Sequence, residues 1–131
     1  MDQTANNRIM IIGGDSNFTY LMQRYVKTSA HQIVFTTLGE DALARARCEK
    51  PVAIVLVVDP PEAIGWHTLQ VLKNDHEVGK TPVIVCSWLD EEAHSMELGA
   101  DFFLHMPILY ADFEAALVTT LLKAQDEANY Q

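Results

Sequence analysis

Residues 51–65 read P-V-A-I-V-L-V-V-D-P-P-E-A-I-G, an apolar run followed by one aspartate, two prolines and, after a short loop, a glycine. No polar residue interrupts positions 52–58, so both faces of this segment are expected to be buried. A strand of that kind is typical of the centre of a parallel sheet whose two faces are covered by helices. Such strands commonly deliver an aspartate to their C-terminal end, so Asp59 is the first candidate for a phosphorylation or metal site.

Short apolar runs and amphipathic segments alternate on both sides of this strand. Five strand–helix pairs with short connections predict an α/β domain, a doubly wound five-stranded parallel sheet with helices on both faces. In such sheets a ligand binds beyond the C-terminal ends of the strands, where the strand order reverses. Ser16 is expected to cap the first helix, whose apolar residues recur every three or four positions up to Val26. The predicted strands are 8–13, 32–37, 52–58, 82–87 and 101–104, and the later helices are 39–49, 65–76, 91–98 and 110–128.

The length and composition are those of one globular domain. The 131 residues are 49% hydrophobic and 21% charged, and a chain of this size buries most of its unfolded apolar surface. We expect a single domain over residues 1–131 with an ordered core from about 8 to 128. The sequence shows no secretory signal pattern, no apolar run long enough to span a membrane and only Cys48 and Cys86 as cysteines. These features predict a cytoplasmic protein without a disulfide framework.

The net charge of −9 is concentrated in the C-terminal half. Residues 66–131 contain 11 acidic and 3 basic side chains. Binding of nucleic acid by this domain is not expected, because that function needs clustered lysine and arginine. An acidic surface suits a basic protein partner, although solubility alone also explains such a charge.

Four stretches resemble the receiver domain of bacterial two-component response regulators, in the same order and over essentially the whole chain. The stretch E-L-G-A-D-F-F-L-H-M-P-I is the most specific, because Gly-Ala-Asp before an aromatic residue and a following proline is the family's habit. The resemblance implies the flavodoxin-like (βα)5 receiver fold, with a Met106–Pro107 bond that is usually cis in the family. The four stretches are 9–12, 51–56, 81–87 and 97–108.

Receivers that work by phosphorylation need an acidic pair for Mg²⁺, an acceptor aspartate, a Ser or Thr, and a lysine. These groups position the phosphoryl group and neutralise charge on its oxygens. Aligned by the resemblance, the acidic pair falls on Gly13 and Gly14, the acceptor on Val57 and the lysine on Met106, and only Ser87 matches. We therefore expect a degenerate site that binds no Mg²⁺ or other cofactor, and a protein that is not an enzyme.

Three further residues surround this degenerate site. Asp15 follows the glycine pair but is a single acid, and Asp59 comes two residues after the acceptor position. Strand alternation puts Asp59 on the same face as the acceptor position, so its carboxylate is expected to overhang the site. Trp88 stands where the family has a small residue, and its indole is expected to narrow or plug the pocket.

The function favoured by these residues is that of a pseudo-receiver, which docks a protein in two-component-type signalling without aspartyl phosphorylation. By resemblance, the contact face comprises residues 91–98, 101–104 and 110–128, and family members also pair through it, so weak homodimers are expected. The acidic and aromatic residues assigned to this face are Asp90, Glu91, Glu92, Glu97 and Phe103, the last at the family's switch position.

Three alternatives remain open at this point, one of which is an enzyme, although no residue pattern names a reaction; the other two concern the degenerate site. In one, Asp59 is a displaced phosphoacceptor with reduced dependence on metal. In the other, a nucleotide or similar small molecule binds in the vacated pocket near Gly13, Gly14 and Val57.

Overall fold

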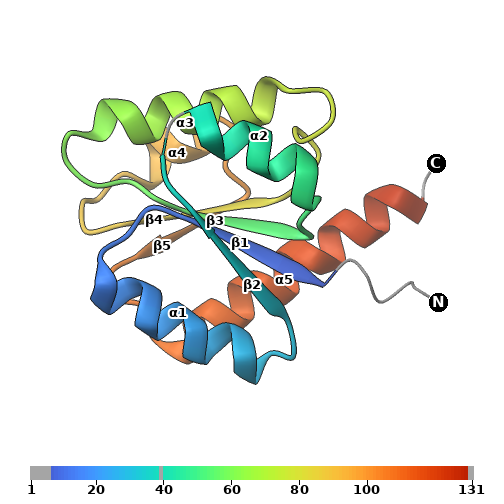
Figure 1. Ribbon diagram of the computed structural model, residues 1–131, viewed down its shortest axis with the longest axis horizontal. Helices are drawn as coiled ribbons and strands as arrows, with labels where there is room; N and C mark the ends of the chain where they lie inside the picture. The colour runs from blue at the N-terminus through green and yellow to red at the C-terminus, as the bar shows by residue number, and fades with distance from the viewer. Residues whose placement is uncertain (1–6, 39, 130–131) are drawn as a thin grey trace.

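The computed structural model describes residues 7–38 and 40–129, with side chains described for all of these except 40 and 123–129. Strands and helices alternate along this part of the chain (Figure 1). No helix within it is long and apolar enough to cross a membrane. The strands are β1 (Arg8–Ile12), β2 (Gln32–Thr36), β3 (Ala53–Val57), β4 (Val83–Ser87) and β5 (Phe102–His105). The helices are α1 (Ser16–Thr28), α2 (Glu40–Glu49), α3 (Glu62–Asn74), α4 (Glu92–Glu97) and α5 (Tyr110–Asn129).

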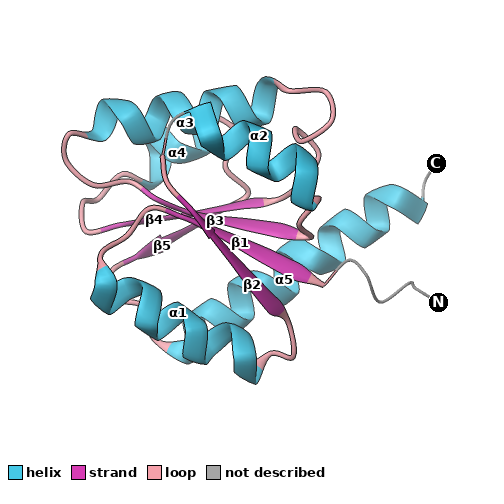
Figure 2. Ribbon diagram, viewed as in Figure 1, coloured by secondary structure: helices cyan, strands magenta, loops and turns pink. Residues whose placement is uncertain are grey.

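The strands form one parallel sheet in the order β2-β1-β3-β4-β5, which confirms the predicted fold class. Helices α1 and α5 lie on one face of the sheet and α2, α3 and α4 on the other (Figure 2). The strand order reverses between β1 and β3, because successive connections pass to opposite sides of the sheet. The C-terminal ends of these two strands are therefore the place where a ligand site is expected.

The central strand β3 is buried along its whole length, as its uninterrupted apolar sequence predicts. Its alternate residues belong to two separate cores. Val55 and Val57 pack with buried residues of α1 and α5, whereas Ile54 and Leu56 pack with buried residues of α2 and α3. Because each residue of β3 contributes to one of these cores, the strand fixes the sheet between both helical layers.

The start of α1 differs from the prediction. The residue that caps this helix is Asp15, not Ser16, and its Oδ1 accepts a hydrogen bond from the backbone N–H of Phe18 at 2.9 Å. Asp15 has the extended backbone of an N-cap, while Ser16 is already helical. The carboxylate therefore satisfies an N–H group that has no partner within the helix.

The start of α3 was also predicted wrongly, at residue 65 in place of Glu62. Gly65 lies inside the helix and allows α3 to approach β3 closely, because a Cβ added there would lie 3.0 Å from Val58 Cγ2. Pro61 precedes the first helical residue, a position where a missing N–H costs nothing. The Met106–Pro107 bond is cis, as the resemblance implies, and Pro60–Pro61 is cis as well.

Candidate functional site

A cavity of about 220 Å³ lies at the C-terminal edge of the sheet. The turn after β1, the first turns of α1, the end of β3, the loop after β4 and the turn after β5 all contribute to its wall. This is the edge where doubly wound sheets bind ligands. The lining residues are Gly14, Asp15, Asn17, Phe18, Leu21, Val57, Asp59, Trp88, Met106, Pro107 and Ile108.

Val57 occupies the end of β3, where the family's phosphoacceptor is expected. Its side chain is 1% exposed and packs in the core beneath α1 and α5. In the sheet Val57 lies beside Cys86 of β4, whose thiol is also buried. The strand end therefore presents an isopropyl group to the cavity and offers neither a carboxylate nor another nucleophile there.

Two carboxylates line the cavity beside Val57. Asp59 is half-buried, and burial raises its pKa, with a further upward contribution from the negative charge of Asp15. Asp15 has one oxygen engaged at the start of α1. Among the lining residues that the structure describes there is neither a lysine nor an arginine to neutralise this pair. Asp59 thus shares the cavity with Val57, and its environment penalises the ionised form.

The glycine pair makes the turn between β1 and α1. Gly13 and Gly14 have φ angles of 85° and 95°, in a region that side chains disfavour. A Cβ on Gly14 would also lie 2.6 Å from Cδ2 of Phe18. An aspartate or glutamate at this position is incompatible with the observed turn and with the packing of that ring. The turn geometry therefore excludes the family's acidic pair from this backbone conformation.

Ser87, the residue that matches the family, is fully buried. Its Oγ accepts a hydrogen bond from the backbone N–H of Leu89 at 3.0 Å, which holds the loop after β4. The lysine position, Met106, is 6% exposed and packs in the core. Both side chains are therefore engaged in structural contacts.

Trp88 forms part of the cavity wall, but 58% of this residue is exposed. A cavity of about 220 Å³ remains beside this residue, so Trp88 does not fill the pocket, and the narrowing expected of its indole stays a prediction. The vacated site is accordingly open to a small molecule.

The predicted contact face includes β5, which is the strand at one edge of the sheet. Asp90, Glu92 and Glu97 are exposed, and Glu91 is partly exposed. Phe103 on β5 is half-buried and packs against the core under α2 and α3. The exposed apolar side chains of Leu89 and Met96 belong to the same loop and helix as the acidic residues.

Asp101 has a structural role that the sequence did not reveal. Its Oδ2 accepts hydrogen bonds from Lys73 Nζ at 3.0 Å and from the backbone N–H of Val83 at 2.8 Å. The lysine also donates to the carbonyl of Thr81. Asp101 therefore joins α3 to the starts of β4 and β5. The Gly-Ala-Asp motif marked this aspartate in the sequence, but it did not show which groups the carboxylate binds.

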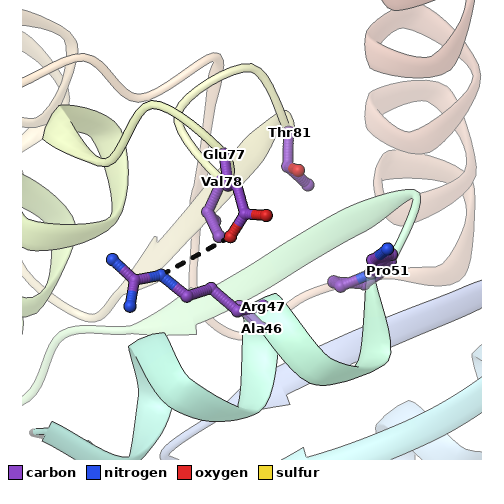
Figure 3. A pocket seen from close by; sticks show the side chains of 7 residues that line it. Ala46, Arg47, Pro51, Glu77, Val78 and Thr81 are labelled. Atoms are coloured by element: carbon purple, nitrogen blue, oxygen red, sulfur yellow. Dashed lines mark ion pairs between the residues drawn. The ribbon is translucent and has the colours of Figure 1, made fainter.

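A second cavity, of about 280 Å³, lies between the end of α2 and the loop before β4. Figure 3 shows Arg47 reaching across it toward Glu77, at 3.7 Å between Nε and Oε1. Arg47 also forms an ion pair with Asp75. The Arg47 hydrogen bond and the N–H groups of Val78 and Glu77 lower the pKa of Asp75 to about 2. Arg47 is therefore already paired with carboxylates, and the other charged side chains of the lining are Lys50 and Glu77.

Metal ligands are sparse in the part of the chain that the structure describes. Within residues 7–38 and 40–129 no group of three or more His, Cys, Asp or Glu side chains is placed to hold a metal ion.

No protein-family model matches the chain. The chain is 26% identical over 123 residues to the alkaline phosphatase synthesis transcriptional regulatory protein PhoP of Bacillus subtilis, covering 92% of this chain and 50% of PhoP. It is 27% identical over 104 residues to protein PilH of Pseudomonas aeruginosa, covering 77% of this chain and 86% of PilH. The chain is a homologue of response regulator receiver domains.

The structural comparison agrees with this assignment. Vibrio cholerae chemotaxis protein CheY4 superposes with a TM-score of 0.77 at 15% identity, over 88% of this chain and 99% of CheY4. A CheY-like receiver domain protein from Methanospirillum hungatei gives 0.79 at 17% identity, over 93% and 98%. At these identities the structures establish the shared fold. The receiver homologue spans about half the length of PhoP and of the other transcriptional regulators that it matches.

Proposed function

We propose that this receiver homologue is a degenerate member that acts in two-component-type signalling by docking a protein partner, independently of aspartyl phosphorylation. The observation that carries the proposal is Val57, a fully buried apolar side chain at the strand end where the family's acceptor is expected. In this proposal the domain is cytoplasmic, is not an enzyme and requires no Mg²⁺.

The charges at the site support this proposal. Phosphoryl transfer requires Mg²⁺ and cationic side chains that neutralise the phosphoryl oxygens. Here Asp15 and Asp59 line the cavity, and its described lining contains no lysine or arginine. A phosphoryl group on Asp59 would face the carboxylate of Asp15, with Met106 at the position where the family's lysine is expected. The electrostatics therefore oppose the modification that controls ordinary receivers.

A beryllofluoride titration followed by amide-proton NMR tests this part of the proposal. Beryllofluoride with Mg²⁺ mimics an aspartyl phosphate, and we expect the spectrum to remain unchanged. Joint shifts at Asp59, Ser87 and Phe103 would refute the proposal and favour Asp59 as a displaced acceptor. In that case an acetyl phosphate reaction should add a phosphoryl mass that Asp59→Asn removes.

The proposed docking face comprises α4, β5 and α5. The loop before α4 and α4 itself carry three exposed acidic side chains, Asp90, Glu92 and Glu97. The apolar side chains of Leu89 and Met96 are exposed on the same segment. Apolar contacts at the centre of an interface and charges at its rim are the usual arrangement, and the charge sets the choice of partner. The partner is accordingly a protein with a basic surface, and weak self-association through the edge strand β5 is a secondary use of the same face.

A pair of charge reversals tests the face. Glu92 is the first residue of α4 and Asp41 the second residue of α2, so both are exposed acids at a helix start. Reversal costs a similar small amount of helix stability at each site. We expect Glu92→Lys to abolish binding of a partner that the unmodified chain and Asp41→Lys both retain. Equal binding by all three proteins would refute the assignment of this face.

A further inference from the structure

The wall of the strand-end cavity combines an apolar interior with two acids. Its apolar side chains come from α1, the end of β3, the loop after β4 and the turn after β5. The acids, Asp15 and Asp59, come from the turn after β1 and the loop after β3. The apolar side chains are Phe18, Leu21, Val57, Trp88, Met106 and Ile108. A cavity of this composition accommodates a ligand that is itself apolar at one end and charged at the other.

The sign of that charge follows from the lining. Within residues 7–38 and 40–129, no hydrogen-bond or ion-pair partner of the Asp59 carboxylate is found. Burial and the charge of Asp15 raise the pKa of Asp59, which means that its ionised form lacks a compensating cation. A bound cation would relieve both effects, whereas an anion would add to the repulsion.

The start of α1 does not reverse this conclusion. A helix N-terminus ordinarily favours an anion, because its N–H groups are unpaired. Here Asp15 Oδ1 accepts from the N–H of Phe18, so a carboxylate of the chain already occupies that position. A nucleotide, the ligand first considered for the vacated pocket, is therefore disfavoured by the charges around it. A bare Mg²⁺ ion is also disfavoured, because the described residues place no group of three or more His, Cys, Asp or Glu side chains to hold a metal, and the largely apolar lining supplies few further oxygens.

The size of the cavity sets the size of the ligand. An apolar cavity of about 150 Å³ is known to hold a benzene ring. The strand-end cavity, at about 220 Å³, is large enough for one aromatic ring with a short chain. Trp88 is part of the lining, and indole is the aromatic ring that attracts cations most strongly.

We propose that this cavity binds a small organic ammonium ion, with its apolar group among Phe18, Leu21 and Ile108 and its ammonium group at Asp15 and Asp59. The proposal adds a small-molecule input at the strand ends to the docking function. It does not depend on which partner the face of α4, β5 and α5 binds.

Calorimetric titration with three probes of similar shape and different charge tests whether the cavity selects a cationic ligand. The probes are phenethylammonium, neutral 2-phenylethanol and anionic phenylacetate. We expect phenethylammonium to bind at least about tenfold more tightly than 2-phenylethanol, a difference of about 1.4 kcal/mol. Phenylacetate is expected to show no binding. Equal affinity for the cation and the alcohol would overturn the proposal, as would the absence of binding by phenethylammonium.

Variants locate the probe within the molecule. Asp59→Asn should weaken phenethylammonium binding about tenfold, because it removes the carboxylate charge and keeps the shape. Asp41→Asn, an exposed acid on α2, is the matched control and should bind as the unmodified chain does. In a Trp66→Phe background the fluorescence change of Trp88 should follow the same titration. Unchanged binding by Asp59→Asn would place the probe elsewhere and overturn the assignment.

The failure of this proposal is distinguishable from failure of the docking function. Glu92→Lys is expected to lose the protein partner and retain phenethylammonium binding. Loss of probe binding in Glu92→Lys would contradict the location of the ammonium site.

Discussion

Gly14, in the turn between β1 and α1, has a backbone conformation and surroundings that leave no room for a side chain. Gly14 has a φ of 95°, and a Cβ there would lie 2.6 Å from Cδ2 of Phe18. We predict that Gly14→Ala destabilises the domain and that Gly14→Asp, which places an acid in the family's metal-binding turn, destabilises it at least as much. The two effects have the same origin, since both begin with the added Cβ.

The magnitude has three contributions. Holding a residue other than glycine in a sparsely populated backbone region costs about 1–3 kcal/mol. Displacing the Phe18 ring from a packed core costs about another 1–3 kcal/mol. The lower entropy of alanine in the unfolded chain returns about 0.4–1 kcal/mol. The expected net loss for Gly14→Ala is therefore about 1–5 kcal/mol, a large part of the stability of a small domain.

Urea denaturation of Gly14→Ala and the unmodified chain measures this loss directly. The ring contribution is isolated by repeating Gly14→Ala in a Phe18→Leu background, where we expect the cost to fall toward the backbone contribution of about 1–3 kcal/mol. A loss below about 1 kcal/mol in the unmodified background would show that the turn does not require glycine. In that case the turn would tolerate an acidic side chain, and its geometry would not explain why glycine stands at this position. Mg²⁺ is not expected to rescue Gly14→Asp.

Three other predictions concern single carboxylates. Asp101→Ala should cost about 1.5–3 kcal/mol in urea denaturation, because it removes the carboxylate partner of the largely buried Lys73, which keeps only the Thr81 carbonyl, and the acceptor of the Val83 N–H. The pKa of Asp75 is about 2, below its unfolded value, so its contribution to stability is present above about pH 4 and is lost as the pH falls toward 2. The stability difference between the unmodified chain and Arg47→Gln should shrink over that range, and a constant difference would contradict the role of this ion pair. The pKa of Asp59 is raised, so the ionised carboxylate opposes folding and its effect appears as the pH rises through the folded pKa. Asp59→Asn should therefore be more stable than the unmodified chain at neutral pH, with the advantage fading in acid, as thermal unfolding at several pH values would show.

Much of the fold follows from local sequence. The apolar residues of β3 have no polar face, which is a property of a strand buried on both sides and is visible without a structure. The apolar stripe of α1 places Phe18, Met22 and Val26 in the core at helical spacing. The absence of an acid at Gly13, Gly14 and Val57 was also readable, because the surrounding stretches align with the family without a gap.

Helix starts were less predictable, because they depend on partners and packing that the sequence does not display. Asp15 and its neighbour Ser16 are both good capping residues, and only the backbone path shows which carboxylate or hydroxyl reaches an N–H group. Gly65 looked like the start of a helix, yet its purpose is the close contact with Val58. That contact depends on the distance between α3 and β3, which is a property of the folded layers.

The sequence by itself determined that this is a parallel α/β domain of receiver type, and its resemblance to receivers predicts that most groups for phosphoryl transfer are missing from their usual positions. Only the tertiary structure decided what replaces them. Asp15 and Asp59 are far apart along the chain, and they come to one cavity because β1 and β3 are neighbours in the sheet. The same sheet order brings Met106 and Ile108, which follow β5, to this cavity as well. Charge, volume and shape of the cavity are set by this meeting of distant segments, which no local pattern of residues specifies.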